Sequence, residues 1–221
     1  MGAADAWAEA VAHTLPGQDL VGVGADLQPW TILSGYRNGV FPMGLGEGGG
    51  PPLGWWSPDP RGVLLPGDLH VSRSLRRSLK AFEIRYDTAF ESVVAGCAAP
   101  HRHGAWITPR IVDAYQDLHH LGWAHSVEAW QDGELVGGLY GLSIGRLFAA
   151  ESKFHTVTDA SKAAVVGLVA AMEEDGMPWV VDVQWRTDHL ASLGVREVPR
   201  TTYLELLGGL IEGEPPPRFR G

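Results

Sequence analysis

Residues 179–185 are Trp179-Val180-Val181-Asp182-Val183-Gln184-Trp185, and this apolar run predicts a short buried strand with a carboxylate at its centre. Side chains alternate along a strand, so Asp182 and Gln184 should project from the same side. An ionised carboxylate is costly to bury without partners, and it therefore marks either a paired charge or a working site. This segment alone leaves both interpretations open: an Asp satisfied by an Arg or by helix N–H groups, or an acid and an amide that together orient a reacting amine or hydroxyl.

Strand and helix patterns surround this segment. Residues 124–131 and 134–142 predict two strands joined by a turn at Asp132-Gly133, which is a hairpin signal, and residues 145–150 predict a third strand. Asp159 should begin a long helix over residues 160–174. After the buried strand, the pattern predicts a helix near residues 189–193 and a strand at residues 196–198. This order of elements resembles the GNAT acetyltransferases, although a fold-level analogy does not fix a function.

The segment before the hairpin predicts further elements. Residues 72–79 and 109–120 should form helices, and residues 82–86 should form a strand. Asp87 should cap a helix that ends at residue 98. Together with the hairpin and the long helix, these elements place the chain in the α+β class.

The first part of the chain is rich in Gly and Pro. A helix over residues 28–39, capped by Asp26, should carry Trp30, Leu33 and Tyr36 on one face. Residues 44–54 should form a loop. The predicted organisation is a small N-terminal α/β domain, a GNAT-like (acyl-CoA N-acyltransferase superfold) C-terminal domain and a flexible Pro-rich tail, over residues 1–69, 70–213 and 214–221.

Composition narrows the class of protein. The chain has 221 residues, of which 45% are hydrophobic and 19% charged, as in ordinary globular proteins. No run approaches the roughly 20 apolar residues of a membrane span, and there is no signal-peptide pattern. The single Cys excludes an internal disulfide framework and favours the cytoplasm. A net charge of −9 argues against broad binding to nucleic acid but not against a local basic patch.

Several short motifs, in a fixed order, carry a family resemblance. They are Tyr36-Arg37-Asn38-Gly39-Val40-Phe41-Pro42, Trp55-Trp56-Ser57-Pro58-Asp59-Pro60-Arg61, Trp106-Ile107-Thr108, His125-Ser126-Val127-Glu128, Glu134-Leu135-Val136-Gly137-Gly138-Leu139-Tyr140-Gly141, Glu151-Ser152, Asp159-Ala160-Ser161-Lys162 and Asp182-Val183-Gln184. Any one of these strings is weak evidence, whereas the ordered set resembles the leucyl/phenylalanyl-tRNA–protein transferase family from about Gly22 to Leu207.

The resemblance implies a reaction. The family moves Leu, Phe or Met from an aminoacyl-tRNA to a protein whose N-terminal residue is Arg or Lys, and the product carries an N-terminal degradation signal. The expected partners are the 3′ aminoacyl-adenosine end and acceptor stem of aminoacyl-tRNA, and proteins or peptides with N-terminal Arg or Lys. Aminolysis of an ester needs positioning and one proton acceptor, so no cofactor, metal or membrane is implied.

The resemblance also implies roles for four residues. Asp182 and Gln184 match the family's catalytic pair: Asp182 would orient the α-amine and draw off its proton, and Gln184 would hold the attacking or acyl group. Glu151 would be a substrate-binding carboxylate, whose charge suits an acceptor that begins with Arg or Lys. Trp106, on a loop before a helix, would stack on the terminal adenosine. The alternatives are a structurally satisfied Asp, an exposed strand-end Glu and a core Trp.

An apolar pocket should accept the Leu or Phe side chain. The positions that match the family's pocket are all apolar here, and each is equally compatible with an ordinary core position: Leu139, Phe148, Val165, Leu168 and Val181. Two positions depart from the family pattern. Met43 replaces the usual aromatic after Phe-Pro, and Lys153 replaces the usual Met two residues after the Glu. A Lys at the rim can keep its amine in water while its stem covers apolar surface, whereas a Lys that points inward would shrink or charge the pocket.

One basic cluster could bind tRNA phosphates. Its members have the spacing i, i+3, i+4, i+7, which predicts one face of a helix: Arg73, Arg76, Arg77 and Lys80. The alternative is a plain solvated helix face.

Two other kinds of site find little support in the sequence. The His residues at 101, 103, 119, 120, 125 and 189, with Cys97 nearby, lack the paired spacing of zinc sites, and Cys97 lies on an apolar helical stretch that favours burial. The Gly-rich segment 44–50 has neither the GxxxxGK[ST] pattern of a phosphate cradle nor a strand before it.

Two rival functions remain. An acyl-CoA-dependent N-acetyltransferase of the same superfold would need a Gly-rich loop before the main helix, where this chain has Phe154-His155-Thr156-Val157-Thr158-Asp159. A non-catalytic tRNA- or degron-binding protein would keep the pocket without the chemistry, but Asp182, Gln184 and Glu151 are all present.

Overall fold

The computed structural model describes residues 3–99 and 106–220 and has a mixed α/β fold. Its elements in chain order are α1 (Ala3–Ala12), β1 (Leu20–Val23), α2 (Pro29–Arg37), β2 (Phe41–Gly44), η1 (Glu47–Gly49), β3 (Leu53–Trp56), β4 (Arg61–Leu64), α3 (Arg73–Ser78), η2 (Leu79–Ala81), β5 (Glu83–Tyr86), α4 (Phe90–Cys97), α5 (Pro109–His120), β6 (Ala124–Gln131), β7 (Glu134–Ile144), β8 (Leu147–His155), α6 (Ala160–Glu173), β9 (Val180–Gln184), α7 (Asp188–Ala191), β10 (Arg196–Val198), α8 (Arg200–Leu210) and η3 (Pro217–Phe219).

Two sheets organise the described residues. The smaller has the order β1-β3-β2, and the larger has the order β10-β4-β9-β8-β7-β6-β5. Every pairing in the larger sheet is antiparallel except that of β8 with β9, which α6 connects. A parallel pair needs such a crossover, so the long helix predicted between these strands is what allows them to lie side by side.

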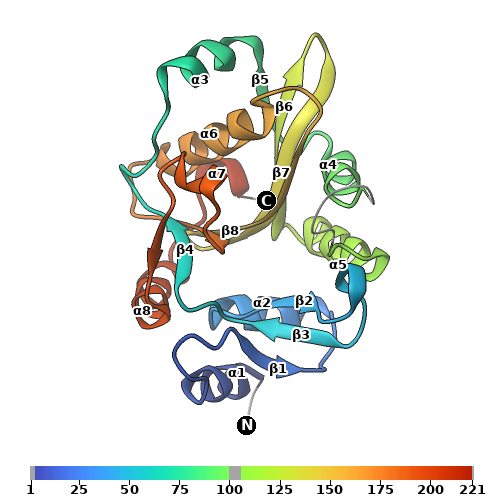
Figure 1. Cartoon of the computed structure of the whole chain (residues 1–221), viewed down its shortest axis with the longest axis vertical. Helices are drawn as coiled ribbons and strands as arrows, with labels where there is room; N and C mark the ends of the chain where they lie inside the picture. Colours follow the sequence, from blue (N-terminus) through green and yellow to red (C-terminus); the bar gives the residue numbers. More distant parts are fainter. Residues whose placement is uncertain (1–2, 100–105, 221) are drawn as a thin grey trace.

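The helices cover both faces of the larger sheet. In Figure 1, α6 lies on one side of β7, and α4 and α5 lie on the other. Gly137 and Gly138 of β7 explain the close packing, because successive residues of a strand face opposite sides. A Cβ at Gly137 would lie 2.7 Å from the Ala160 Cβ of α6, and one at Gly138 would lie 3.1 Å from a methyl of Val93 in α4. These two glycines therefore let a helix approach each face.

The two strands that position the site, β8 and β9, stop pairing with each other before they end. β8 and β9 pair only from Leu147 to Ala149 on one strand and from Val180 to Asp182 on the other, although β8 continues to His155 and β9 to Gln184. The register of β8 also shifts against β7 next to Glu151, and that of β9 shifts against β4 next to Val183. Such bulges bend a strand and re-aim its side chains. The result is an opening between the two strands at their C-terminal ends.

The predictions for the second half of the chain are largely confirmed. The helix over 109–120, the hairpin and the strand around Asp182 are present. The third strand is longer than predicted, because β8 begins at Leu147 and runs to His155. Asp87 does not cap a helix: α4 has Ala89 at its N-cap, and the Asp87 carboxylate instead accepts hydrogen bonds from His125 and from the Ser126 N–H.

The N-terminal part differs more from expectation. Asp26 does not cap α2, whose N-cap is Gln28, and Trp30 is 69% exposed rather than on the buried face with Leu33 and Tyr36. β4 belongs to the larger sheet, so the change from one sheet to the other falls between Trp56 and Arg61.

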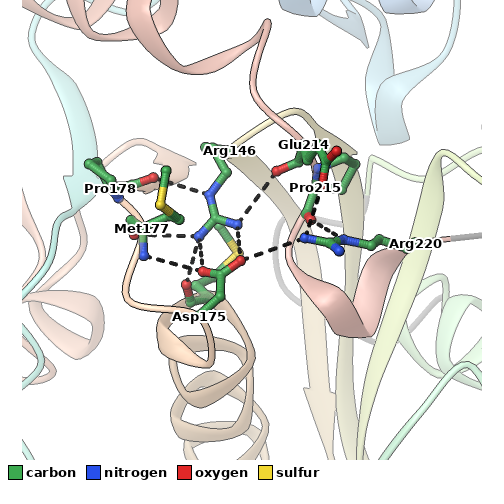
Figure 2. A network of polar contacts seen from close by, with 8 residues as sticks. Arg146, Asp175, Met177, Pro178, Glu214, Pro215 and Arg220 are labelled. Atoms are coloured by element: carbon green, nitrogen blue, oxygen red, sulfur yellow. Dashed lines mark hydrogen bonds and ion pairs between the residues drawn. The ribbon is translucent and has the colours of Figure 1, made fainter.

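The C-terminal segment is packed rather than loose, which corrects the prediction of a flexible tail. Phe219 is 2% exposed, and its ring centroid lies 5.1 Å from that of Phe148. Figure 2 shows the polar half of the attachment. Buried Arg146 forms a two-pronged ion pair with Asp175 at 2.8 and 2.9 Å and donates to the backbone carbonyl of Glu214, while Arg220 contacts Asp175 and the Glu214 carboxylate. Hydrogen-bonded carbonyls and a buried ring hold this segment in place.

No helix within residues 3–99 and 106–220 is both long enough and apolar enough to cross a bilayer.

Candidate active site

An apolar cavity of about 100 Å³ opens between β8, β9 and α6, at the point where the two strands separate. Its apolar lining comes from β4, β7, β8, α6, β9 and the segment around α7, and its polar lining comes from Glu151, Ser152, Lys153 and Gln184. Cavities that combine a mostly apolar wall with a few convergent polar groups are the usual form of small-molecule sites.

Glu151 sits at the bulge of β8 and is 9% exposed. The hydroxyl of Tyr36 donates to its Oε1 at 2.6 Å, and the hydroxyl of Tyr115 donates to its Oε2 at 3.0 Å. Burial raises the pKa of Glu151 to about 7, although these two hydrogen bonds favour the ionised form and act in the opposite direction. Glu151 is therefore a carboxyl group that can exchange a proton near neutral pH.

Asp182 is set back from the cavity and has no solvent exposure. Arg61, equally buried, binds both of its oxygens, with Nε 2.8 Å from Oδ1 and Nη2 2.6 Å from Oδ2. The Tyr203 hydroxyl donates to Oδ2 at 2.9 Å, and the Gln184 backbone N–H donates to Oδ1 at 2.9 Å. Each oxygen thus accepts two hydrogen bonds, which compensates the cost of burying the charge.

Gln184 lies between the two carboxylates. Its backbone has φ of +60°, a left-handed conformation that is strained for a non-Gly residue and that recurs at functional sites. Its amide fits best with the nitrogen donating to the backbone carbonyls of Val183 and Ala150, both at 3.0 Å. The amide oxygen then faces the Oε1 of Glu151, at the position 3.4 Å away that the nitrogen holds in the opposite orientation. The backbone N–H of Gln184 holds Asp182, and its side chain faces Glu151.

The structure gathers most of the predicted pocket residues at this cavity. Those that line it are Leu139, Lys153, Val165, Leu168 and Val181. Phe148 does not line it: the ring is fully buried and packs against Phe219. Trp106 lies elsewhere, on the loop before α5, partly buried against the core. A Cβ at Gly49 would lie 2.0 Å from the Trp106 carbonyl oxygen, so only Gly lets the Gly-rich loop pass this closely.

Four residues that hold the carboxylates received no role in the sequence analysis. They are Tyr36, Arg61, Tyr115 and Tyr203. Tyr36 and Arg61 stand inside the quoted motifs, so membership of a motif was a signal that could have found them. Tyr115 and Tyr203 carried no such signal, because they lie in helix segments that look like ordinary core.

The basic cluster is partly helical. Arg73, Arg76 and Arg77 belong to α3, and Lys80 lies in the following 3-10 turn, which corrects the single helix expected over residues 72–79. All four side chains are exposed, and Arg76 also donates to the backbone carbonyl of Val71 at 2.9 Å.

In the part of the chain that the structure describes, no three His, Cys, Asp or Glu side chains are grouped so as to hold a metal ion, and His101 and His103 lie outside that part. His125 is paired with Asp87, and Cys97 is buried in α4, as its helical pattern predicts.

A strained residue, a buried carboxyl group of raised pKa and an apolar cavity together define the class: this is the arrangement of an enzyme's active site. Comparisons with known proteins then narrow this class to one family. A family model described as leucyl/phenylalanyl-tRNA protein transferase matches residues 63–208, and a model of that family's N-terminal domain matches residues 25–59.

Curated relatives carry the same description. The chain is 49% identical to the leucyl/phenylalanyl-tRNA–protein transferase of Nitrosospira multiformis over 196 residues, covering 87% of this chain and 83% of that one. It is 48% identical to that of Aromatoleum aromaticum (90% and 84% covered) and 49% identical to that of Stutzerimonas stutzeri (85% and 83% covered). The chain belongs to the leucyl/phenylalanyl-tRNA protein transferase family.

A comparison with solved structures found a ribosomal-protein-alanine N-acetyltransferase from Brucella melitensis biovar Abortus 2308. The two chains share 23% identity and align with a TM-score of 0.34 over 45% of this chain and 75% of the other. A score this low does not establish a shared fold.

Proposed function

We propose that this chain transfers Leu, Phe or Met from aminoacyl-tRNA to the N-terminus of a protein. The observation that carries the proposal is a cavity whose lining is mostly apolar and includes Glu151 and Gln184 among its few polar groups. An apolar side chain attached to an ester fits such a site, with its carbonyl beside the two polar groups. Family membership supports the same conclusion, since the matching relatives are named for this transfer.

The remaining predicted residues receive proposed roles. Asp182 and Gln184 form the centre of the catalytic site, and Trp106 is the stacking surface for the terminal adenosine. The exposed Arg73, Arg76, Arg77 and Lys80 contact phosphates of the acceptor stem, where a local basic patch can act within an acidic chain. Neither a cofactor nor a metal enters this mechanism.

Lys153 lies at the cavity and is partly exposed. We place its amine at the rim, with the stem covering apolar surface. The choice among Leu, Phe and Met depends on how much of the cavity that stem occupies.

The acceptor is proposed to begin with Arg or Lys, because Glu151 presents a carboxylate in the cavity lining. The modified protein would then carry a degradation signal, and the enzyme would act in the cytoplasm, where aminoacyl-tRNA is made.

The larger sheet is proposed to be a GNAT-like domain that follows a small N-terminal domain. The support is the order of elements from β6 to β10, with one parallel pair, β8 and β9, that separates beside the site. The rival acyl-CoA activity on such a scaffold is not favoured by any feature of the cavity.

The test is mass-spectrometric detection of a modified peptide after incubation with charged tRNA. With Leu-tRNA as donor, a peptide that starts with Arg should gain one Leu, because the ester is already activated and the site supplies orientation. Acetyl-CoA as donor should leave the same peptide unchanged.

The matched acceptor is the same peptide with Ala in place of the first Arg, which should remain unmodified. Acetylation of the Arg peptide, or no transfer from Leu-, Phe- or Met-tRNA by folded protein, would contradict the proposed function.

A further inference from the structure

The site contains two carboxyl groups, those of Glu151 and Asp182, and only that of Glu151 lines the cavity. Asp182 has no exposed surface and does not line the cavity. Among the described residues, Glu151 is the only carboxylate that lines it, and the only other ionisable side chain in the lining is Lys153, a cation. Glu151 is therefore the carboxylate placed to accept a proton from an amine that reacts at this cavity.

The oxygens of Asp182 are also fully used. Two donors of Arg61 hold them, and the Tyr203 hydroxyl and the Gln184 backbone N–H complete the set. These four hydrogen bonds, two of them from a fixed cation, leave no free position on the carboxylate for an incoming amine. Asp182 is instead well placed to fix the strained backbone at Gln184.

The environment of Glu151 differs from that of Asp182, whose carboxylate is held by the cation of Arg61. Its donors are the neutral hydroxyls of Tyr36 and Tyr115, whose oxygens lie 2.6 Å apart, and burial raises the pKa values of both tyrosines well above their ordinary range. They therefore stay protonated and orient the carboxylate without neutralising it. A general base acts best when its pKa is close to the working pH, and that of Glu151 is about 7.

We propose that Glu151, and not Asp182, accepts the proton of the attacking amine, and that Asp182 is a positioning residue acting through Arg61 and the Gln184 backbone. This inference rests on the proposed aminoacyl transfer. The neutral amine forms the N–C bond to the acyl carbon, Glu151 takes one proton from that nitrogen, the ester C–O bond breaks, and the proton passes to the ribose oxygen. The carboxylate is regenerated, and no other reactant is needed.

Gln184 completes the cycle. When Glu151 is protonated, the amide oxygen of Gln184 faces it and can accept its hydrogen bond, because the amide nitrogen is held by the carbonyls of Val183 and Ala150. The two states of Glu151 thus each have partners, which keeps the carboxyl group in one position while it exchanges its proton.

The groups that control this proton come from several elements. Tyr36 on α2 and Tyr115 on α5 bond the carboxylate directly, and Tyr140 on β7 packs against Tyr115 with ring centroids 5.4 Å apart. Two further charges act on Glu151 from the buried ion pair: Asp182 raises its pKa and Arg61 lowers it. Lys153 lies on the same strand at the cavity wall.

The test measures the single-turnover rate of Leu transfer to an Arg-starting peptide at saturating substrate, across pH, for wild type and Glu151→Gln. The variant should be slower by about 10²- to 10⁴-fold above pH 7, the usual contribution of a general base. The ratio of the two rates cancels the titration of the amine itself. The wild-type rate divided by the Glu151→Gln rate should rise with pH and level off above the pKa of Glu151, which is about 7.

Tyr115→Phe supplies a readout that a purely structural role would not move. Loss of a donor to the ionised carboxylate raises the pKa of Glu151, so the midpoint of the rate profile should move to higher pH. Asp182→Asn should reduce the rate but keep a pH midpoint, moved to lower pH because the Asp182 charge raises the pKa of Glu151, whereas Glu151→Gln should show no such midpoint.

Equilibrium unfolding gives a second measurement that does not use activity. The pKa of Glu151 is raised in the folded state, so its contribution to stability is complete below the unfolded pKa of about 4.5 and is lost as pH rises to about 7. Wild type should therefore lose stability relative to Glu151→Gln across that window.

The outcomes separate two failures. No transfer by wild type would overturn the proposed function itself. Transfer by wild type, together with a Glu151→Gln variant that works at the wild-type rate or a rate ratio that does not change with pH, would overturn only the role of Glu151.

Discussion

Replacing Arg61 with Met is expected to lower the free energy of unfolding by about 3–5 kcal/mol, because it leaves the fully buried Asp182 carboxylate without its cation. Arg61 also donates to the backbone carbonyl of Gly39 at 3.0 Å and lies over the rings of Phe41 and Tyr203. It therefore connects the segment after α2 to β9 and α8. Urea unfolding followed by tryptophan fluorescence gives the measurement.

The double variant Arg61→Met with Asp182→Leu is the matched control. Removing both partners of a buried ion pair leaves no uncompensated charge, and such replacements are often neutral or stabilising. The double variant should therefore recover a large part of the stability that the single variant loses. A single variant as stable as wild type would contradict the account of Asp182 as a charge that Arg61 compensates.

Replacing Phe219 with Ala is expected to cost about 3–5 kcal/mol of stability, the range measured for large aromatic side chains in cores. Its ring packs against those of Phe148, His125 and Tyr86, with centroids 5.0 to 6.1 Å away. Calorimetric thermal unfolding would show the loss of stability. The size of the cavity that the variant leaves beside Phe148 would show whether neighbouring side chains relax into the space.

Met177→Ala serves as the control for this variant. Met177 lies close to the same network, but its side chain is 55% exposed, and the contact of this residue with Arg146 is made by the backbone carbonyl. Surface substitutions of this kind usually change stability by about 0.5 kcal/mol or less. If Phe219→Ala behaved like Met177→Ala, the C-terminal segment would not be part of the core.

Regular elements with a clear period could be predicted from the sequence. Helix α5 begins and ends at the predicted residues because Thr108 caps it and Pro109 opens it, and the hairpin follows from Asp132-Gly133 between two apolar runs. The short strands of the first part could not be recognised. The strand β2, Phe41-Pro42-Met43-Gly44, has no alternation, and α8 contains Gly208 and Gly209, which weaken a helical pattern.

The composition of the site was predictable, but the environments of its acids were not. Asp182 was recognisable because a carboxylate in an apolar run is unusual. The environment of Glu151 depends on Tyr36 and Tyr115, which are 115 and 36 positions away in the chain. No local pattern reports contacts over such separations, so the partner of each carboxylate was visible only in the structure. The same applies to the C-terminal segment, where three Pro residues suggested looseness and one buried Phe fixes it.

The measurement that tests the central claim most directly is the rate of Leu transfer from Leu-tRNA to an Arg-starting peptide by a variant whose cavity is filled. Val165 lines the cavity from α6, so Val165→Phe places a ring where the aminoacyl side chain is proposed to bind. Val166→Phe, on the same helix but outside the cavity lining, is the matched control. Wild type and Val166→Phe should transfer Leu, whereas Val165→Phe should remain folded and lose the activity. Transfer by Val165→Phe at the wild-type rate would mean that the aminoacyl group binds elsewhere.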